Sequence, residues 1–177
     1  GSGTYYATDG FSRVGDRDNG EADATLKYAG TLRGSYDAGE GRSLSFGRNG
    51  YHQDSEIDKS ATVDATGYTS ARDLFDGFAR FTTPSHDGRM VHTITVFGTS
   101  TTRDYVEPTR DTKYRGTDVG IEYQGTLKFG QAGSLLGGLR LERETAYQKV
   151  STSASPAFDG GQTLYAGYLL YQLPVNE

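Results

Sequence analysis

Strict alternation of apolar and polar side chains most constrains how this chain can fold, and it is clearest over residues 113–129. Alternate side chains of a β-strand point to opposite faces, so a strand here has one apolar and one charged face. The apolar face carries Val119, Ile121, Tyr123, Gly125, Leu127 and Phe129, and the other carries Asp118, Gly120, Glu122, Gln124, Thr126 and Lys128. Sustained helical periodicity is absent. The pattern therefore predicts an all-β fold.

The same alternation recurs along the chain. It is regular over residues 23–36, 89–101 and 134–147, and less regular over 42–52, 72–82 and 163–173. A further short strand is expected at residues 2–8. The sequence therefore predicts about eight strands.

The connections between these strands alternate in length. Three short ones are rich in glycine, at residues 37–41, 84–88 and 130–133. Glycine supplies the positive φ angles that tight hairpin turns need. The other connections, at about 9–22, 53–71, 104–112 and 148–162, are longer and polar. In an up-and-down sheet this places the short turns at one end and the long loops at the other.

Composition excludes several classes of function. The chain of 177 residues has 18 basic and 23 acidic side chains, a net charge of −5, which argues against a nucleic-acid partner. The absence of cysteine excludes a disulfide scaffold, a thiol nucleophile and a cysteine-ligated metal. The 13 Tyr and 8 Phe argue against a disordered chain. We expect one domain over residues 1–177.

Strand length favours a membrane barrel over a soluble sandwich. Several predicted strands exceed the roughly five or six residues usual in soluble sheets, and a strand crossing a bilayer needs about 9 to 11. An aromatic residue also ends the apolar face beside each short turn or beside Pro174, as in an interfacial girdle. These four residues are Tyr36, Phe81, Phe129 and Tyr171.

The opposite face of the predicted strands is charged, which suits a watery or plugged lumen better than a packed core. It carries Lys27, Arg33, Asp118, Glu122, Arg140, Glu142 and Glu144. Across the turn at 130–133, Glu122 and Arg140 are expected to lie close enough to pair. The predicted fold class is therefore an antiparallel, up-and-down transmembrane β-barrel segment with short periplasmic turns and long extracellular loops.

Three stretches carry a family resemblance: GTYYATDGFSRV (3–14), DGRMVHTITVFGTSTTRDY (87–105) and TDVGIEYQGTLKFGQAGSLLGGLRLERE (117–144). In their order and spacing they resemble the barrel of TonB-dependent outer-membrane receptors of the vitamin B12 and siderophore type. The resemblance spans about residues 3–173. It implies a bacterial outer-membrane location and import of a ferric siderophore or cobalamin. It also implies contacts with membrane lipid, and with the TonB complex through a plug domain.

The chain departs from that family in three ways. It contains nothing that resembles a plug or a TonB box, and its eight predicted strands compare with about 22 in the family barrels. It also ends in LPVNE rather than in an aromatic strand. We therefore expect an internal barrel segment without a plug domain. A small self-standing eight-stranded or porin-like barrel is one alternative, and a soluble all-β binding module is another.

Catalysis is not expected. His52, His86 and His92 fall at a strand end, in a turn and on an apolar face, and they are not spaced as metal ligands or as a triad. Glu142 and Glu144 share a face with Arg140, which favours a ladder of lumen charges over a glycosidase pair. The GRNG stretch at 47–50 does not match a phosphate-binding loop. No catalytic, cofactor or metal residues are therefore assigned.

Two loops are acidic, and closely spaced carboxylates can bind Ca²⁺. These residues are Asp9, Asp16, Asp18, Glu21 and Asp23 in the first loop, and Asp54, Glu56, Asp58 and Asp64 in the second. The family resemblance adds some weight to loop calcium, but solvated charged loops are the simpler reading. Ligand contacts in such receptors are expected from the upper wall, and the specific ligand residues stay unknown. The corresponding region here comprises Arg103, Asp104, Tyr105, Tyr114 and loop 53–71.

Overall fold

A computed structural model describes residues 1–10, 23–57, 67–85 and 88–173. The strands are β1 (Ser2–Thr8), β2 (Thr25–Gly39), β3 (Arg42–Glu56), β4 (Thr69–Ser85), β5 (Met90–Glu107), β6 (Arg110–Lys128), β7 (Ser134–Val150) and β8 (Phe158–Gln172). A single turn of 3-10 helix, η1 (Gly130–Ala132), joins β6 to β7. The described part of the chain contains no helix long and apolar enough to cross a membrane.

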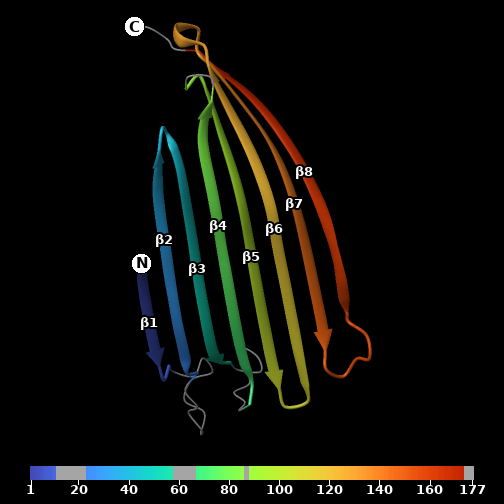
Figure 1. Cartoon of the computed structure of the whole chain (residues 1–177). Helices are drawn as coiled ribbons and strands as arrows, with labels where there is room; N and C mark the ends of the chain where they lie inside the picture. Colours follow the sequence, from blue (N-terminus) through green and yellow to red (C-terminus); the bar gives the residue numbers. More distant parts are fainter. Residues whose placement is uncertain (11–22, 58–66, 86–87, 174–177) are drawn as a thin grey trace.

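The eight strands form one antiparallel sheet in which each strand pairs with its neighbours in sequence (Figure 1). The predicted all-β, up-and-down fold is therefore confirmed. Within the described residues β1 pairs only with β2, and β8 only with β7, so the sheet curves but has two free edges. This differs from the alternative of a closed eight-stranded barrel, which requires β1 to pair with β8.

Three short turns lie at one end of the sheet, as predicted (Figure 1). The β2–β3 turn has positive φ angles at Gly39, Glu40 and Gly41, and Gly133 has a φ of 105° where the β6–β7 connection ends. At Gly39, Gly41 and Gly133 the absence of a side chain avoids the clash that a Cβ atom makes in this region. The middle turn contains residues 86 and 87, which lie outside the described residues.

The opposite end differs from the prediction at one connection. Residues 104–112 were expected to form a long loop, but Glu107 pairs with Arg110 and leaves only Pro108 and Thr109 in the turn. Both strands simply continue, because residues 104–107 and 110–112 keep a regular ladder of hydrogen-bonded pairs. The β7–β8 connection is also shorter than expected and covers residues 151–157. The polarity of these residues therefore marks exposed strand ends rather than long loops.

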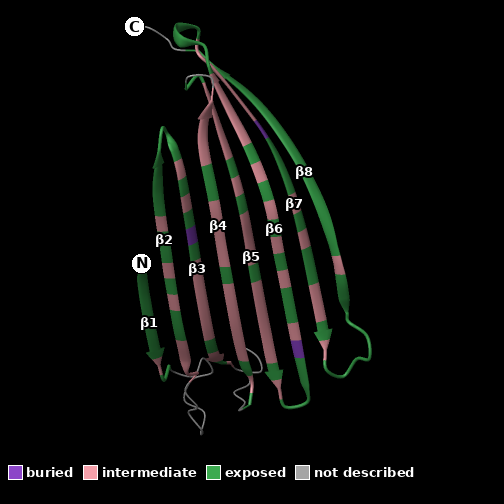
Figure 2. Ribbon diagram, viewed as in Figure 1, coloured by how far each residue is buried: buried purple, intermediate pink, exposed green. Residues whose placement is uncertain are grey.

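No second layer covers the sheet, and no described apolar side chain is buried (Figure 2). Val119 is 55% exposed and Leu139 is 67% exposed. A soluble β-sandwich would bury these groups between two sheets. The described residues therefore form a single layer with an exposed apolar face, which differs from the two packed layers of a sandwich.

The outward face carries a slanted band of apolar residues, which we call the apolar band. Cross-strand pairing places them in one continuous surface. The band comprises Leu32, Tyr36, Leu44, Phe46, Ala79, Phe81, Met90, Ile94, Val96, Val119, Ile121, Tyr123, Leu127, Leu135, Leu139, Leu141, Tyr165, Leu169 and Tyr171. Beyond the row of Arg48, Val119 and Arg143 most outward residues are polar or glycine, although Tyr28, Phe75 and Val106 are exceptions. We take the stretches that carry the band as the membrane-spanning segments.

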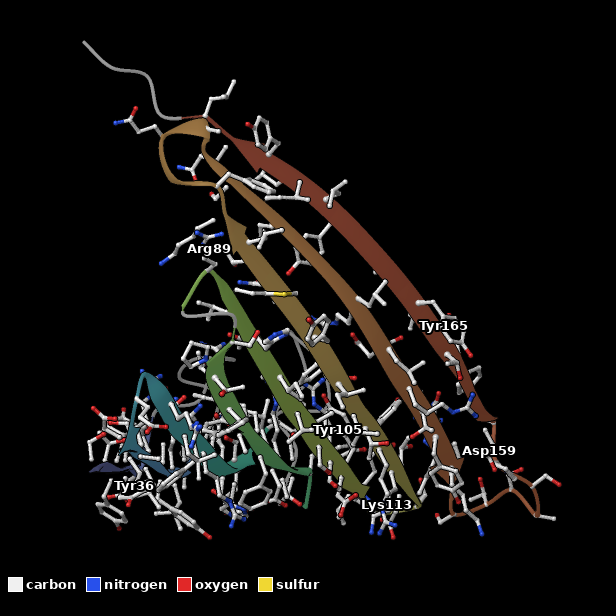
Figure 3. The ribbon with its side chains drawn as sticks, turned by 45° about the horizontal axis from the view of Figure 1, so that its top comes forward. Tyr36, Arg89, Tyr105, Lys113, Asp159 and Tyr165 are labelled. Atoms are coloured by element: carbon white, nitrogen blue, oxygen red, sulfur yellow. The ribbon has the colours of Figure 1, made fainter. Side chains whose placement is uncertain are left out.

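The predicted aromatic belt lies at the short-turn end of the sheet. Tyr36, Phe81 and Tyr171 share the outward face of the descending strands, and Phe129 immediately follows β6. All four side chains are exposed. Tyr36, labelled in Figure 3, lies three residues before the end of β2 at Gly39. Aromatic rings in this position sit where hydrocarbon meets the polar headgroups.

The charged face is the concave one, because its side chains reach across an intervening strand. The Arg140 guanidinium in β7 lies 4.3 Å from the centre of the Phe97 ring in β5. Arg140 also lies directly opposite Glu122 at 3.8 Å, which confirms the predicted pair, and its Nε donates to Glu142 at 2.7 Å. Glu144 accepts a hydrogen bond from Gln162 at 2.6 Å. These groups form the predicted ladder of lumen charges.

Candidate ligand-binding wall

A cross-strand row on the concave face concentrates positive charge near the loop end of the sheet. Successive register partners in β2 to β7 place its members side by side. They are Lys27, Gln53, Arg72, Arg103, Tyr114 and Gln148. Side chains directly opposite in adjacent strands have Cβ atoms about 5 Å apart, so the row presents one surface to a molecule in the lumen. We call this row, with the neighbouring Tyr51 and Tyr105, the basic–aromatic row.

Tyr51 joins the first two cations of the row. Lys27 Nζ lies 4.8 Å from the centre of the Tyr51 ring, and the guanidinium carbon of Arg72 lies 5.8 Å from it. A cation over an aromatic face is attracted by the electron-rich face of the ring. The Tyr51 hydroxyl donates to Gln53, which fixes the ring in this position. Both cations are thus held without being neutralised.

A second group lies where β5 meets β6. Arg103 Nη1 donates to the Tyr105 hydroxyl at 3.3 Å, and the Tyr105 and Tyr114 rings meet edge to face with centres 6.0 Å apart. Gln148 Nε2 donates to the Tyr114 hydroxyl at 3.3 Å. Figure 3 labels Tyr105 on β5. These contacts order two ring edges and one guanidinium at the mouth of the lumen.

The electrostatics of the row favour an anion. Among the described residues, Lys27, Arg72 and Arg103 form no ion pair with a carboxylate. Arg72 Nε is buried and has no hydrogen-bond acceptor within the described structure.

The sequence located part of this site. Arg103, Tyr105 and Tyr114 do face the lumen near the loop end, whereas Asp104 faces outward and pairs with Lys113 at 3.2 Å. Asp104 therefore does not belong to the lumen-facing group of this region. It lies between two inward residues, and strand alternation turns it to the other side. Within loop 53–71, residues 58–66 lie outside the described structure.

Sequence reasoning missed Tyr51 and Arg72 as members of the row. Their strands, 42–52 and 72–82, have a less regular apolar pattern, so their inward phase was not evident. The signal that could have found them is the spacing of Tyr51 and Gln53 two residues apart, on the face opposite Phe46. Only the register of β3 with β2 and β4 brings Tyr51 beside Lys27 and Arg72.

The histidines are held by local partners. His52 Nδ1 lies 2.6 Å from Asp73, its Nε2 lies 2.8 Å from Asp54, and its ring stacks on Tyr28. His52 faces outward, two rows of register pairs beyond the apolar band. The carboxylates of Asp73 and then Asp54 hydrogen-bond the ring and raise the pKa of His52 above its usual value.

His92 lies on the outward face, as predicted. It bonds the Tyr123 hydroxyl at 2.7 Å and Ser85 Oγ at 2.9 Å. These contacts suit a packing role near the short-turn end of β5. His86 lies outside the described residues.

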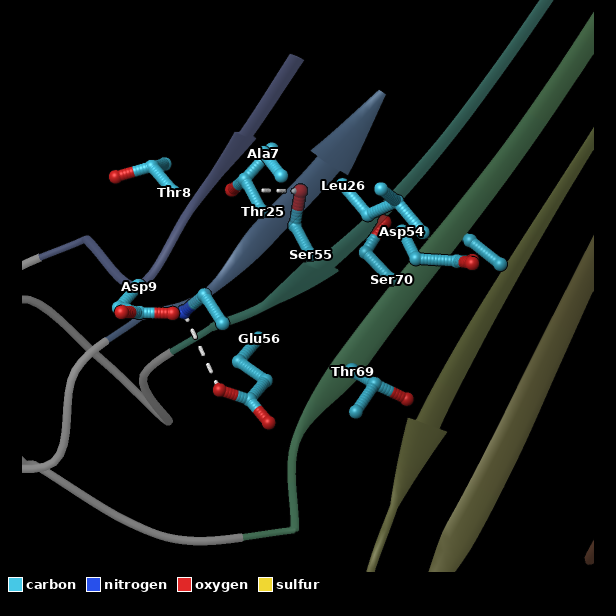
Figure 4. Close-up of a pocket in the computed structure, with 12 residues that line it drawn as sticks. Ala7, Thr8, Asp9, Thr25, Leu26, Asp54, Ser55, Glu56, Thr69 and Ser70 are labelled. Atoms are coloured by element: carbon cyan, nitrogen blue, oxygen red, sulfur yellow. Dashed lines mark hydrogen bonds between the residues drawn. The ribbon is translucent and has the colours of Figure 1, made fainter. Parts of the chain in front are cut away.

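The acidic loop ends border a groove of about 560 Å³ where β1 to β4 meet the loops (Figure 4). Asp9, Asp54 and Glu56 line it. Asp54 is engaged with His52, and Glu56 Oε2 accepts from the backbone N–H of Ala24 at 3.2 Å. Across the described ranges, no three acidic or histidine residues come together as a metal-binding group.

The remaining carboxylates of the calcium hypothesis cannot be placed. Asp16, Asp18, Glu21, Asp58 and Asp64 lie outside the described residues. Loop calcium therefore stays a prediction.

The architecture and the two faces together define a class of fold: the wall of an outer-membrane β-barrel. The structure is similar to that of the ferric-catecholate import receptor Fiu of E. coli K12, with a TM-score of 0.57 and 12% sequence identity over 83% of this chain. The ferric yersiniabactin uptake receptor FyuA of Yersinia pestis also matches, at a TM-score of 0.48 and 12% identity over 84% of this chain. At this identity the likeness to Fiu shows the fold alone.

The chain spans about a third of the length of Fiu, since the match covers 32% of it, and 25% of FyuA. No protein-family model matches this sequence. A search of curated proteins also finds no match.

Proposed function

We propose that this chain forms part of the barrel wall of a TonB-dependent receptor in the bacterial outer membrane. In this proposal the receptor imports an anionic metal chelate of the ferric siderophore kind. The observation that carries the choice of ligand is the basic–aromatic row, in which Lys27, Arg72 and Arg103 face the lumen without carboxylate partners. The outer-membrane fold and the sequence resemblance support the same class of protein.

The row supplies two kinds of contact. Its guanidinium and ammonium groups attract oxygen anions of a chelate, and Arg binds planar oxygen pairs through two parallel N–H donors. Tyr51, Tyr105 and Tyr114 add ring faces and edges for aromatic chelating groups. This combination favours an anionic chelate over cobalamin, the other ligand class that the sequence resemblance implies.

Binding would be followed by transport without covalent chemistry. In the proposed receptor a plug domain fills the barrel, and the TonB complex supplies the energy that moves the plug and releases the chelate inward. The wall presented here contributes the first docking surface and the charged lumen. This role requires no catalytic residue and no resident cofactor.

The proposal is tested by chelate binding to the complete receptor in detergent. The probes are an iron(III) tris-catecholate complex and cyanocobalamin, measured by titration calorimetry. The double variant Arg72→Gln/Arg103→Gln should bind the catecholate complex at least roughly a hundredfold more weakly, since each of the two charge-assisted hydrogen bonds contributes about 1.5 to 3 kcal/mol.

Arg80→Gln is the matched control. Arg80 also faces the lumen, but it lies nearer the short turns and donates to Thr95 at 3.2 Å. This control removes one lumen charge without touching the row and should keep parental affinity. The single variants Arg72→Gln and Arg103→Gln, which also remove one charge each, are compared with it directly. Tighter binding of cyanocobalamin than of the catecholate complex, or an unchanged double variant, would contradict the proposed ligand class.

A further inference from the structure

A trough of about 550 Å³ lies on the concave face of β5 to β8, where one cross-strand row has almost no side-chain volume. Successive register partners place the members of that row side by side, and they are Thr101, Gly116, Ala146 and Gly160. The rows on either side carry larger side chains, so the trough runs between them. Asp159, labelled in Figure 3 at the loop end of β8, immediately precedes Gly160. We call this space the lumen trough.

The two sides of the lumen trough differ in chemistry. On the loop side, Phe158 of β8 lies opposite Gln148 and extends the basic–aromatic row onto the last strand. On the short-turn side, Asp118 of β6 and Glu144 of β7 lie directly opposite each other and line the trough. The trough is therefore continuous with the proposed ligand-binding wall, but its far side is acidic.

Neither carboxylate is neutralised by the protein. In the part of the chain that the structure describes, Asp118 and Glu144 form no ion pair. Glu144 accepts a hydrogen bond from Gln162 at 2.6 Å, whereas Oδ1 of Asp118 is buried and has no described donor. Like charges directly opposite each other destabilise a sheet, so a cation between the two carboxylates would be favourable.

The lumen cation nearer the short turns is already engaged. Arg140 pairs with both Glu122 and Glu142, so it does not serve the two carboxylates of the trough. The positive charge of the basic–aromatic row lies on the other side. Along β6, the row at Tyr114 and the carboxylate of Asp118 are four residues apart, or about 13 Å. A chelate on the row therefore reaches Asp118 with an arm of only a few bonds.

We propose that the lumen trough binds a positively charged arm of the imported chelate. The ligand would then be zwitterionic, with its anionic metal centre on the basic–aromatic row and an ammonium group between Asp118 and Glu144. An ammonium group has three donors and can bond to both carboxylates. The aliphatic part of the arm would lie against Ala146 and the Phe158 ring. Charge complementarity and continuity with the row support this occupant.

The inference rests on the proposed function and names a further feature of its ligand. It also predicts discrimination between ligands that share a metal centre. A neutral arm leaves the two carboxylates repelling each other, and an anionic arm adds a third negative charge. Only a cationic arm removes the repulsion.

The test uses the complete receptor in detergent and two iron(III) complexes of one tripodal tris-catecholate, titrated by calorimetry. One complex carries a single aminopropyl arm, which is protonated at about pH 7. The other carries a hydroxypropyl arm of the same length. The parent should bind the amino complex at least roughly tenfold more tightly, because its charge attracts both carboxylates.

The test variant is Asp118→Asn/Glu144→Gln, and the matched control is Asp37→Asn/Glu122→Gln. Asp37 and Glu122 also face the lumen but lie nearer the short turns, so the control removes the same charge away from the trough. The test variant should bind the two complexes about equally, whereas the control should keep the parental preference.

A second variant fills the trough without changing its charge. Ala146→Leu places a larger side chain on the floor of the trough and should also reduce the preference for the amino complex. It keeps the inference testable if the double variant does not fold.

Three results would overturn the inference: equal binding of the two complexes by the parent, a test variant that keeps the preference, and a control that loses it to the same extent. The tris-catecholate complex without an arm, measured on the same samples, separates two failures. If it binds the parent but the amino arm adds no affinity, the trough assignment fails and the proposed import function stands. If it does not bind, the proposed ligand class fails, and the trough assignment fails with it.

Discussion

The hydroxyl of Tyr168 in β8 lies 3.0 Å from Oε1 of Gln124 in β6, across the intervening strand β7. Gly138 of β7 makes this contact possible, because a Cβ atom at that position would lie 2.5 Å from the Tyr168 hydroxyl. The tyrosine ring therefore covers the exposed backbone of a glycine and connects three strands. The contact also shows why the concave face can hold a glycine within a strand: a neighbouring ring occupies its missing side-chain volume.

Removing this hydroxyl should weaken the wall measurably. Tyr168→Phe deletes the hydrogen bond to Gln124 and keeps the ring over Gly138. We expect the free energy of unfolding to fall by about 0.5 to 1.5 kcal/mol, the usual net contribution of one hydrogen bond. Urea unfolding of the protein in detergent measures the change. A second substitution, Gln124→Ala, should add less in the Tyr168→Phe background than alone, and simple additivity would show that the two groups are not coupled.

A charge placed on the apolar band should destabilise the protein according to depth. Ile121→Arg lies inside the band, one outward position from its Val119 end, and should cost up to the roughly 2 to 4 kcal/mol typical of the midplane in lipid vesicles. Val119→Arg lies at the end of the band and should cost only about 0 to 1 kcal/mol, because the charged end reaches the interface. Thr126→Arg, on the concave face beside Leu127, is the control. Equal stability of Ile121→Arg and the parent would mean that Ile121 does not face lipid.

The contribution of Arg140 to stability should depend on its acidic neighbours in the lumen, Glu122 and Glu142. Arg140→Gln leaves Glu122 and Glu142 facing each other without a cation. The side chain of Arg140 is 41% exposed, so solvent screening limits the expected loss to about 1 kcal/mol or less. The Glu142→Gln substitution should recover part of that loss. Unfolding at low and high salt gives the check, since a charge effect shrinks as salt rises, whereas a packing effect does not.

His52 should make the stability of the loop end depend on pH. Its pKa is raised above the usual 6.5 by hydrogen bonds to Asp73 and then Asp54. A raised folded-state pKa means that the contribution is fully present below pH 6.5 and is lost as pH rises through the folded-state value. His52→Asn should therefore cost more stability at about pH 5.5 than at about pH 8.5.

The partners of His52 provide the control for that measurement. Asp73→Asn/Asp54→Asn removes the carboxylates and should abolish the difference between the two pH values. The same pH dependence in that variant would assign the effect to another group.

Strand alternation accounts for what could be predicted about the fold. The phase of residues 113–129 and 134–147 places Ile121 on one face and Glu122 on the other in any sheet, because a strand has a period of two. The tight turn at 130–133 then brings Glu122 opposite Arg140. These are local relationships, and the structure contains them as predicted. The prediction of a long loop at 104–112 was wrong for a related reason. Where a strand extends beyond its apolar stretch, its residues are polar, and their composition is the same as that of a loop.

The candidate site was only partly predictable. Arg103, Tyr105 and Tyr114 lie near the β5–β6 hairpin, so sequence proximity pointed to them. Lys27 and Arg72 are 45 residues apart in the numbering but share the ring of Tyr51. The contact depends on the register of three strands, β2, β3 and β4. Side-chain pattern alone does not specify that register.

The sequence by itself determined which side of every regular strand meets lipid and which meets the lumen, because alternation follows from the backbone geometry of each residue. Only the tertiary structure decided which side chains from distant strands share a row, that the eight strands stay open at both edges, and where charge gathers on the lumen wall. Those properties depend on inter-strand register and sheet curvature, which arise from hydrogen bonds between segments far apart along the chain.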